Sequence, residues 1–154
     1  MADAIPTERE LQALKVIWQR GPATVREICE AIGERGETLA YTTVLSLLQV
    51  MEQKGLVGHT SQGKVYSYFA RVRREPTFRR LARGFLETVF DGALDEYLVH
   101  ALEARELSSD ELARLEEMIA DARRLARAGS GSTSQAARKS GTSRRSRNAP
   151  KGTP

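Results

Sequence analysis

The chain has 154 residues, of which 40% are apolar, 29% charged and 6% aromatic, and its formal net charge is +4. This composition excludes a fibrous or wholly disordered chain. The sequence contains no run of 18 apolar residues, no hydrophobic leader and one cysteine, Cys29, so we expect a cytoplasmic protein without membrane span, secretory signal or internal disulfide.

Two capping boxes and their apolar periodicity predict three helices in the first third of the chain. The boxes begin at Thr7 and Thr24, and each has a glutamate three residues later. A third helix is expected over residues 38–54, with Gly55 after its end. The apolar positions of the three helices are Leu11, Leu14, Ile17 and Trp18, then Val25, Ile28 and Ile32, then Val44, Leu48 and Met51.

Residues 56–69 change to a strand pattern. Strands are expected over 56–60 and 65–69, joined by a turn at 61–64 that contains Gly63. Helix, short helix, long helix and hairpin follow one another in a winged helix-turn-helix. We therefore predict a mainly α fold with a small β-hairpin, in which residues 1–73 form a winged helix-turn-helix DNA-binding domain.

Residues 74–128 are predicted to be a helical dimerisation domain. One helix runs from Pro76 to Phe90, a second follows Asp91-Gly92, and a third begins with a capping box at Ser108. Three short helices make a small core, and apolar residues on both sides of the first helix indicate that a second copy covers them. The expected interface residues are Phe78, Leu81, Phe85, Leu86, Val89, Leu98, Leu102, Leu115, Met118 and Ile119.

The positive charge belongs to the last segment, residues 129–154, which has six basic and no acidic residues. Residues 1–70 and 71–128 each carry a net charge of −1. The segment also lacks Val, Ile, Leu, Met and aromatic residues, so burial cannot offset its chain entropy. We predict a disordered basic tail over 129–154.

The helix over residues 38–54 is the candidate DNA-reading element, because the second helix of a helix-turn-helix enters the major groove. With its apolar positions turned inward, Thr42, Ser46, Gln49 and Gln53 form an outward stripe, and Thr43 lies beside it. Threonine and serine can donate to phosphates or bases, and glutamine can pair with adenine. A merely solvated polar face remains an alternative interpretation.

The hairpin and the arginines that follow it are candidates for backbone contacts. His59 and Lys64 belong to the predicted wing. Arg71, Arg73 and Arg74 could bind phosphates at its flank, which we favour, or pair with the acidic residues of the helices that follow. No catalytic triad, carboxylate pair or phosphate-binding glycine loop is present, so we expect neither an enzyme nor a cofactor or metal.

Several segments resemble the BlaI/MecI family of penicillinase repressors. They are LQALKVIW at 11–18, TVREI at 24–28, LAYTTV at 39–44 and KGLV at 54–57. The similarity continues through 66–68 and 85–86 to 112–119, and it covers about residues 5–125. The segment at 39–44 is the most specific, because generic winged helices do not share it.

The resemblance implies a homodimeric winged-helix repressor that binds a palindromic operator, commonly of β-lactamase and sensor genes. It implies a recognition role for Tyr41, Thr42, Thr43 and Ser46. It also implies dimerisation through residues 75–125 and cleavage by a membrane sensor-protease. The cleavage position falls at His100-Ala101, where this chain departs from the family's Asn-Phe pair. The C-terminal Cys-x-Cys pairs of copper-responsive relatives are absent.

Two alternatives to a sequence-specific repressor remain at the level of sequence. The near-neutral residues 1–128 would also suit a winged-helix module that binds another protein and carries a basic tether. The tail alone, through its basic residues between 138 and 151, could bind nucleic acid without specificity.

Overall fold

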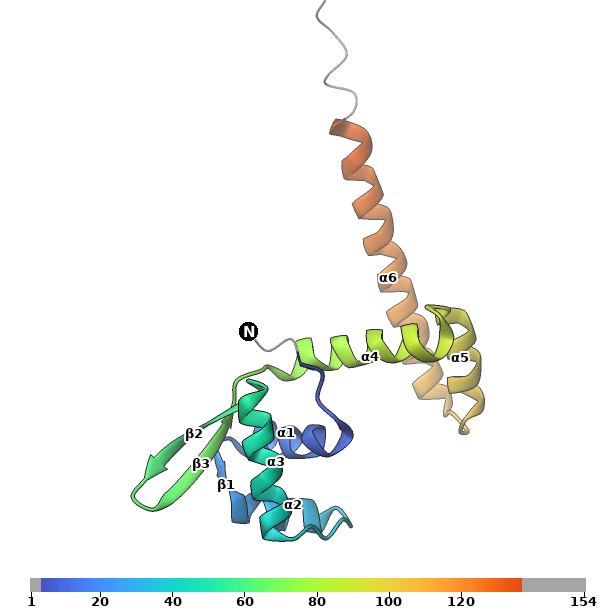
Figure 1. Cartoon of the computed structure of the whole chain (residues 1–154). Helices are drawn as coiled ribbons and strands as arrows, with labels where there is room; N and C mark the ends of the chain where they lie inside the picture. Colours follow the sequence, from blue (N-terminus) through green and yellow to red (C-terminus); the bar gives the residue numbers. More distant parts are fainter. Residues whose placement is uncertain (1–3, 137–154) are drawn as a thin grey trace, which may run out of the picture. The chain divides into compact units, whose positions relative to one another are not determined.

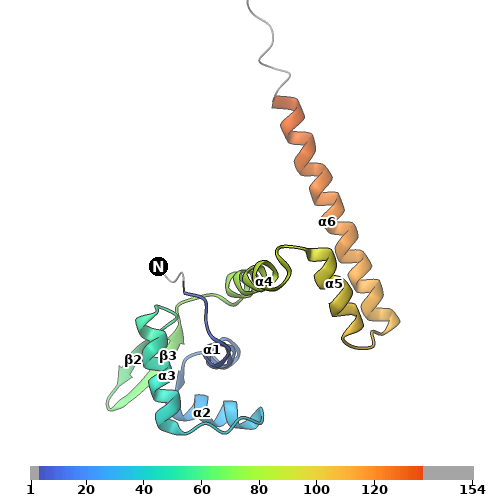
Figure 2. The ribbon, with the colours of Figure 1, turned by 45° about the vertical axis from the view of Figure 1, so that its right-hand side comes forward.

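The computed structural model describes residues 4–136 of the chain. Figures 1 and 2 show a winged helix-turn-helix, in which three helices pack together and a hairpin extends away from them. Its elements are α1 (Glu8–Arg20), β1 (Ala23–Thr24), α2 (Val25–Glu34), α3 (Tyr41–Gln53), β2 (Val57–Gln62) and β3 (Val65–Ala70). The predicted mainly α fold with a small hairpin is confirmed.

Both predicted capping boxes are present in the winged helix-turn-helix. The Thr7 amide donates to the Glu10 carboxylate at 2.8 Å, and the Glu10 amide donates to the Thr7 hydroxyl at 3.4 Å. At α2 the Thr24 amide donates to the Glu27 carboxylate at 2.7 Å, and the return bond is 3.2 Å long. Each box satisfies backbone donors that a helix start otherwise leaves unpaired.

Helix α3 begins at Tyr41, three residues later than the sequence predicts. Ala40 caps it with extended backbone and no side-chain hydrogen bond. The preceding Leu39 packs against the core, and its carbonyl accepts from the Cys29 thiol at 3.0 Å. These tertiary contacts hold the segment before α3 in a non-helical conformation, which the local pattern did not reveal.

The sheet has three antiparallel strands in the order β1-β3-β2. Gln62 faces Val65 in the hairpin, so β2 extends two residues further than predicted and the turn is only Gly63-Lys64. Gly63 supplies this turn with its positive φ of 66°. The short strand β1 was not predicted, because two residues carry no periodicity.

One apolar core joins α1, α2, α3 and the base of the sheet. Its buried side chains include all the predicted inward residues of α3 and α2, whereas in α1 Leu14 and Ile17 are buried and Leu11 and Trp18 are half-buried. The largest of them are Leu14, Val16, Ile28, Ile32, Val44, Leu48, Met51, Leu56 and Val57. This core fixes the rotation of α3, and therefore decides which of its residues face outward.

The remaining helices are α4 (Arg74–Phe90), α5 (Leu94–Glu103) and α6 (Ser109–Ala136). Asp91 ends α4 in the left-handed conformation, with φ 49°, as the predicted interruption requires. The predicted capping box precedes α6: the Ser108 amide donates to the Glu111 carboxylate at 3.0 Å, and the Glu111 amide donates to the Ser108 hydroxyl at 3.2 Å.

Helix α6 continues to Ala136, so the first eight residues of the predicted disordered tail are helical. Extending a formed helix adds one hydrogen bond for each residue that is fixed. A glycine costs only about 1 kcal/mol in such a helix and does not by itself end it. The rest of the predicted tail lies outside the described residues.

The chain divides into two compact units after Leu98, later than the boundary predicted after residue 73. The start of α4 belongs with the winged helix-turn-helix because Trp18 holds it there. The Trp18 indole N–H donates to the carbonyl of Val72 at 2.9 Å, and its ring meets Phe78 edge-on at 5.7 Å between centroids. Composition and periodicity contain no signal of this contact across 54 residues.

Candidate nucleic-acid interface

The exposed face of α3 carries uncharged polar side chains. Val44, Leu48 and Met51 are completely buried, which turns the opposite face of the helix outward. The predicted stripe of Thr42, Ser46, Gln49 and Gln53 is exposed in full, and so is Thr43 beside it. Helix α3 therefore offers hydroxyl and amide groups together with threonine methyls, and no formal positive charge, to a partner surface.

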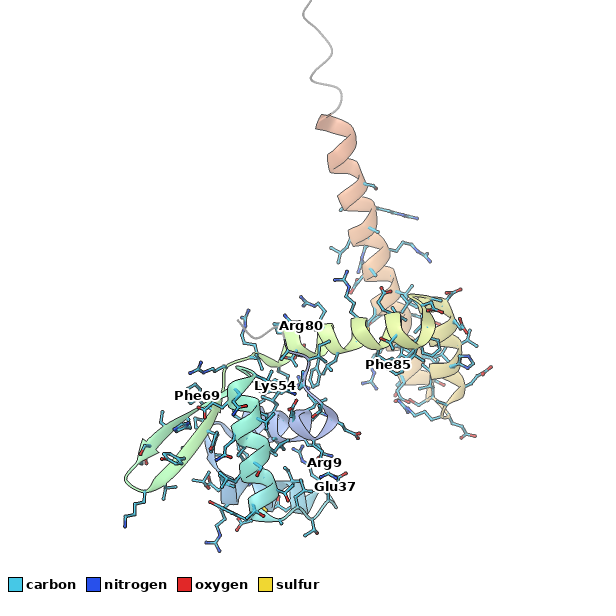
Figure 3. All side chains as sticks on the ribbon, in the orientation of Figure 1. Arg9, Glu37, Lys54, Phe69, Arg80 and Phe85 are labelled. Atoms are coloured by element: carbon cyan, nitrogen blue, oxygen red, sulfur yellow. The ribbon has the colours of Figure 1, made fainter. Side chains whose placement is uncertain are left out.

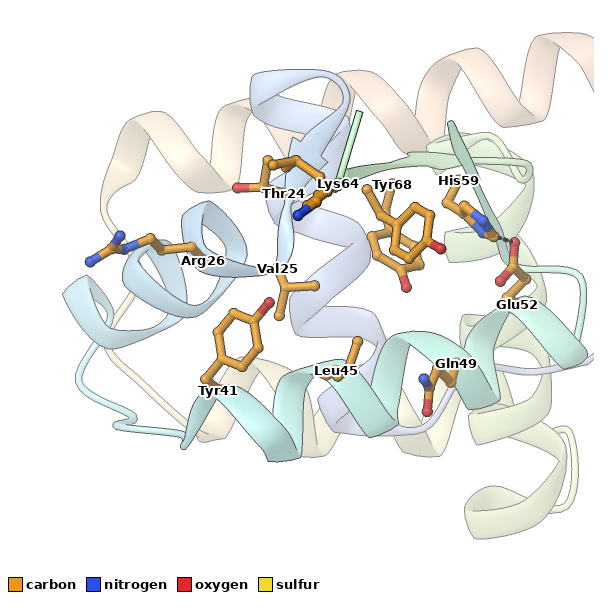
Figure 4. Close-up of a pocket in the computed structure, with 12 residues that line it drawn as sticks. Thr24, Val25, Arg26, Tyr41, Leu45, Gln49, Glu52, His59, Lys64 and Tyr68 are labelled. Carbon is orange, nitrogen blue, oxygen red and sulfur yellow. Dashed lines mark hydrogen bonds and ion pairs between the residues drawn. The ribbon is translucent and has the colours of Figure 1, made fainter. Parts of the chain in front are cut away.

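A groove between α3 and the hairpin brings several predicted contact residues together (Figure 4). Tyr41 and Gln49 line it from α3, His59 from β2 and Lys64 from the turn. Its remaining lining residues are Thr24, Val25, Arg26, Leu45, Glu52, Val65, Tyr66 and Tyr68. Thr42, Thr43 and Ser46 do not line the groove but stand on the exposed face of the same helix.

His59 joins the hairpin to the end of α3. Its Nδ1 lies 2.7 Å from Oε1 of Glu52, as the dashed line in Figure 4 marks. Its ring also meets Tyr66 edge-on at 4.7 Å between centroids. These contacts tie the wing to α3, while the side chain stays exposed, and a DNA contact of His59 stays a prediction.

Two tyrosines of β3 complete the aromatic wall of the groove. Tyr66 and Tyr68 share a face of the strand, since side chains alternate along it. Burial raises the pKa of the Tyr68 hydroxyl, and the nearby Glu52 carboxylate raises it further, so this hydroxyl stays protonated. Tyr66 is a lining residue that was not predicted, although its alternation with Tyr68 along β3 would have indicated it.

The positive charges at the groove are few and exposed. Lys64 occupies the tip of the hairpin. Arg26, at the start of α2, is largely exposed and lies 3.4 Å from Glu30, an ion pair too open to bind either side chain tightly. Arg26 was not predicted as a contact residue, because the sequence marks it only by its place in the first turn of α2. Both cations can therefore turn toward an anionic partner.

The three predicted flanking arginines are not brought into this groove. Arg71 and Arg73 line a separate hollow with Leu56 and Leu81. Arg74 lies 2.9 Å from Glu75 and stacks on the Phe78 ring at 4.8 Å. A role of these arginines in phosphate binding therefore requires a surface beyond the one that α3 and the hairpin form.

The family model of the penicillinase repressor matches residues 6–121. The chain belongs to the penicillinase repressor family. The curated penicillinase repressor of Bacillus licheniformis is 23% identical over 113 residues, which are 73% of this chain and 88% of that protein. As a member of the family, the protein is a DNA-binding transcriptional repressor and not an enzyme.

Solved structures of winged helices are also similar to this repressor. The monomeric form of Bacillus licheniformis BlaI, solved with the blaP half-operator, is 25% identical, with a TM-score of 0.40, and the match covers 48% of this chain and 90% of that one. A homodimeric winged helix-turn-helix domain from Mycobacterium bovis is 28% identical, with a TM-score of 0.39. The match covers 57% of this chain and 72% of that one.

Most residues predicted to dimerise the repressor are exposed, whereas Phe78 is not. Phe78 is half-buried and packs on Trp18 within the same chain, so its role in dimerisation stays a prediction. Leu81 and Leu86 are half-buried. The exposed members of the predicted set are Phe85, Val89, Leu98, Leu102, Leu115, Met118 and Ile119.

The predicted cleavage position lies inside a helix. His100 and Ala101 both belong to α5, and the backbone carbonyl of His100 accepts from the Ala104 amide at 3.0 Å. A protease would have to unwind this turn before the bond could enter an extended active-site cleft. Within residues 4–136 no cluster of His, Cys, Asp and Glu could hold a metal ion, and no helix there is long and apolar enough to cross a membrane.

Proposed function

We propose that the repressor binds a palindromic operator as a homodimer and places α3 of each protomer in the major groove. The observation that carries this proposal is the outward polar stripe of α3 beside the wing groove. A dimer with one such helix per protomer requires half-sites about one or two helical turns apart. The exposed apolar side chains of α4, α5 and α6 supply the surface for the second copy.

The chemistry of α3 favours contacts to adenine and thymine. Gln49 can pair with adenine through two hydrogen bonds, and the methyl group of Thr43 can pack on that of thymine. No arginine is available on α3 for the common contact to guanine. Lys64 and Arg26 would bind the flanking phosphates, because both are exposed at the rim of the groove.

The regulated genes are proposed from the relatives. The curated Bacillus licheniformis relative is a penicillinase repressor, and BlaI of the same organism was solved in complex with the blaP half-operator. We propose that this repressor likewise controls a β-lactamase gene or other genes of an antibiotic or stress response. A transcript comparison between cells with and without the repressor would test this assignment.

Operator binding is tested by titrating the full chain against duplex DNA from its own upstream region. A shuffled duplex of equal length at the same salt concentration serves as the control. We expect tight binding to the upstream duplex only, with two protomers per site. Equal weak binding to both duplexes would contradict recognition at that region.

The reading role of α3 is tested by Thr43→Ala and Gln49→Ala. Each change should weaken operator binding by about 1–3 kcal/mol, because a base contact is lost. The melting temperature should not change, since both side chains are exposed. Gln19→Ala, on the exposed side of α1, is the matched control. Unchanged affinity in both α3 variants would overturn the assignment of the reading face.

A further inference from the structure

Helix α6 exposes an apolar stripe that continues beyond the part of the chain that the family model matches. Leu112, Leu115 and Ile119 are exposed large side chains on it. Ala122, Ala126 and Gly129 continue the same stripe past residue 121, where the family match ends. The spacings alternate between 3 and 4 residues, which is the heptad pattern of paired helices. The stripe therefore has a large-residue half followed by a small-residue half.

The charges of α6 divide in the same place. Residues 110–121 hold five acidic residues and one arginine, whereas 122–130 hold three arginines and no acidic residue. A single helix thus carries opposite charges on its two halves. Each half is complementary to the other half of a second copy, and only when the two helices run in opposite directions.

We propose that α6 pairs antiparallel with α6 of a second copy, about a twofold axis between residues 120 and 121. The proposal rests on the homodimer proposed above and gives it a register. Antiparallel packing sets each large residue against a small one. Its layers are Leu112 with Gly129 of the partner subunit, Leu115 with Ala126 of the partner subunit, and Ile119 with Ala122 of the partner subunit.

The residues that flank the stripe fit the same register. On one side Glu116 meets Arg123 of the partner subunit, and the twofold axis makes this pair twice. On the other side Met118 meets Leu125 of the partner subunit. Met118 and Leu125 are 63% and 74% exposed in the single chain, the largest exposures among the bulky apolar residues that the structure describes. The pairing therefore covers the apolar surface that the chain alone leaves most open.

A parallel pair would satisfy none of these features. It would set Leu112 on its own copy and Ala126 on its own copy, so the helices would be spread at one end and close at the other. It would also align acidic halves with each other and basic halves with each other. Side-chain packing and charge pairing therefore both favour the antiparallel arrangement over the parallel one.

Cysteine cross-linking in the full chain distinguishes the two arrangements. In a Cys29→Ser background, the double variant Leu115→Cys/Ala126→Cys should form an intermolecular disulfide on oxidation. The single variants Leu115→Cys and Ala126→Cys should not, because each new thiol then faces a residue without sulfur. Cross-linking of the single variants would overturn the proposal, and so would a double variant that is dimeric but does not cross-link.

Charge reversal tests the flanking pair independently of cysteine chemistry. Glu116→Arg should raise the dissociation constant of the dimer about tenfold, because two attractive pairs become repulsive. Adding Arg123→Glu should restore the original value. Glu117→Arg is the matched control, since residue 117 lies on the opposite side of the helix and should change the constant less than about twofold. Equal weakening by Glu116→Arg and Glu117→Arg would contradict the register.

Failure of this register and failure of the proposed function give different results. A chain that binds its operator with two protomers but does not cross-link at residues 115 and 126 dimerises in another way. A chain that cross-links as expected but does not discriminate the upstream duplex from the shuffled one has this helix pair and another DNA target.

Discussion

A half-buried ion pair connects the end of α3 to the start of α1. Lys54 follows the end of α3 (Figure 3). Its Nζ lies 2.7 Å and 3.0 Å from the two carboxylate oxygens of Glu10 in α1. The Glu10 side chain is only 3% exposed. Burial raises the pKa of the Glu10 carboxyl, but the hydrogen bond and charge of Lys54 and the Thr7 amide outweigh burial and lower it overall.

The variant Glu10→Gln tests this pair through the pH dependence of stability. At pH 7 it should lower the free energy of unfolding by about 2 kcal/mol, because Lys54 loses a charged hydrogen-bond partner. The pKa is lower in the folded than in the unfolded chain, so the carboxylate stabilises the fold at neutral pH. This contribution is lost as the pH falls through the folded-state value. Urea unfolding at pH 7 and pH 3 should therefore show a smaller difference from the unmodified protein at pH 3.

The exposed pair of Arg20 and Glu34 provides the control for Glu10. Its nitrogen and oxygen atoms are 2.9 Å apart, but both side chains face solvent. Glu34→Gln should change the free energy of unfolding by less than about 0.5 kcal/mol at either pH. An equal loss of stability for Glu10→Gln at both pH values would show that packing, and not charge, explains its effect.

At the scale of single residues, sequence predicts contacts that are close along the chain. The boxes at Thr7 and Thr24 were predicted because their partners lie three residues away. The partner of Glu10 across 44 residues, and that of Trp18 across 54, depend on how helices meet and have no local pattern. The outward stripe of α3 was predictable because burial of one helix face determines the other.

The hairpin depends on a glycine, Gly58, that lies within strand β2 and not in a turn. A Cβ atom added to Gly58 would lie 2.7 Å from a ring carbon of Phe69 and 2.8 Å from Nε of Arg71. Phe69 faces Gly58 across the β2–β3 ladder. The end of the Arg71 side chain can move away from an added Cβ atom, but the Phe69 ring is held close to the strand that carries it. The hairpin therefore packs its aromatic side chain over a backbone position without a side chain.

The variant Gly58→Ala should destabilise the fold by about 1–3 kcal/mol, because the Phe69 ring must shift. Gly33→Ala is the opposite control: nothing lies within 4 Å of its added Cβ, and it is within α2. It should stabilise by about 0.5–1 kcal/mol through helix propensity. Thermal unfolding should show a lower melting temperature for Gly58→Ala and a higher one for Gly33→Ala. Equal melting temperatures for Gly58→Ala and the unmodified protein would contradict the steric argument.

At the scale of elements, length decided what sequence could predict. The hairpin strands have six residues each and show alternation, whereas β1 has two residues and shows none. β1 exists because Ala23 pairs with Tyr68 and Thr24 with Ser67, contacts across more than 40 residues. The late start of α3 has the same origin, since Cys29 and the core hold Leu39.

At the scale of the whole molecule, exposed apolar residues concentrate in the C-terminal half of the described chain. Phe85 and Val89 on α4, Leu102 on α5, and Met118 and Ile119 on α6 are all exposed. A stable monomer rarely leaves so many bulky apolar side chains in water. The sequence indicated this surplus through apolar residues on two sides of one helix. It did not show that Phe78 also packs on Trp18 within the chain, because that contact depends on where Trp18 lies.

The variant Ile119→Glu should separate DNA reading from dimerisation. A charge in the centre of the α6 stripe should make the chain monomeric, because it would have to be buried without a partner. Two linked half-site contacts bind far more tightly than one. We therefore expect affinity for a full operator to fall about 100-fold, while affinity for a half-operator stays unchanged, since α3 is untouched.

Ala120→Glu is the matched control for this experiment. It adds the same charge one residue away, on the side of α6 that faces away from the stripe, and should leave both affinities and the dimer intact. Titration of the two duplexes, together with sedimentation of the free proteins, measures all of these quantities. Ile119→Glu could instead lower half-operator affinity as strongly as full-operator affinity. Its effect would then lie in the folding of the winged helix-turn-helix and not in dimerisation.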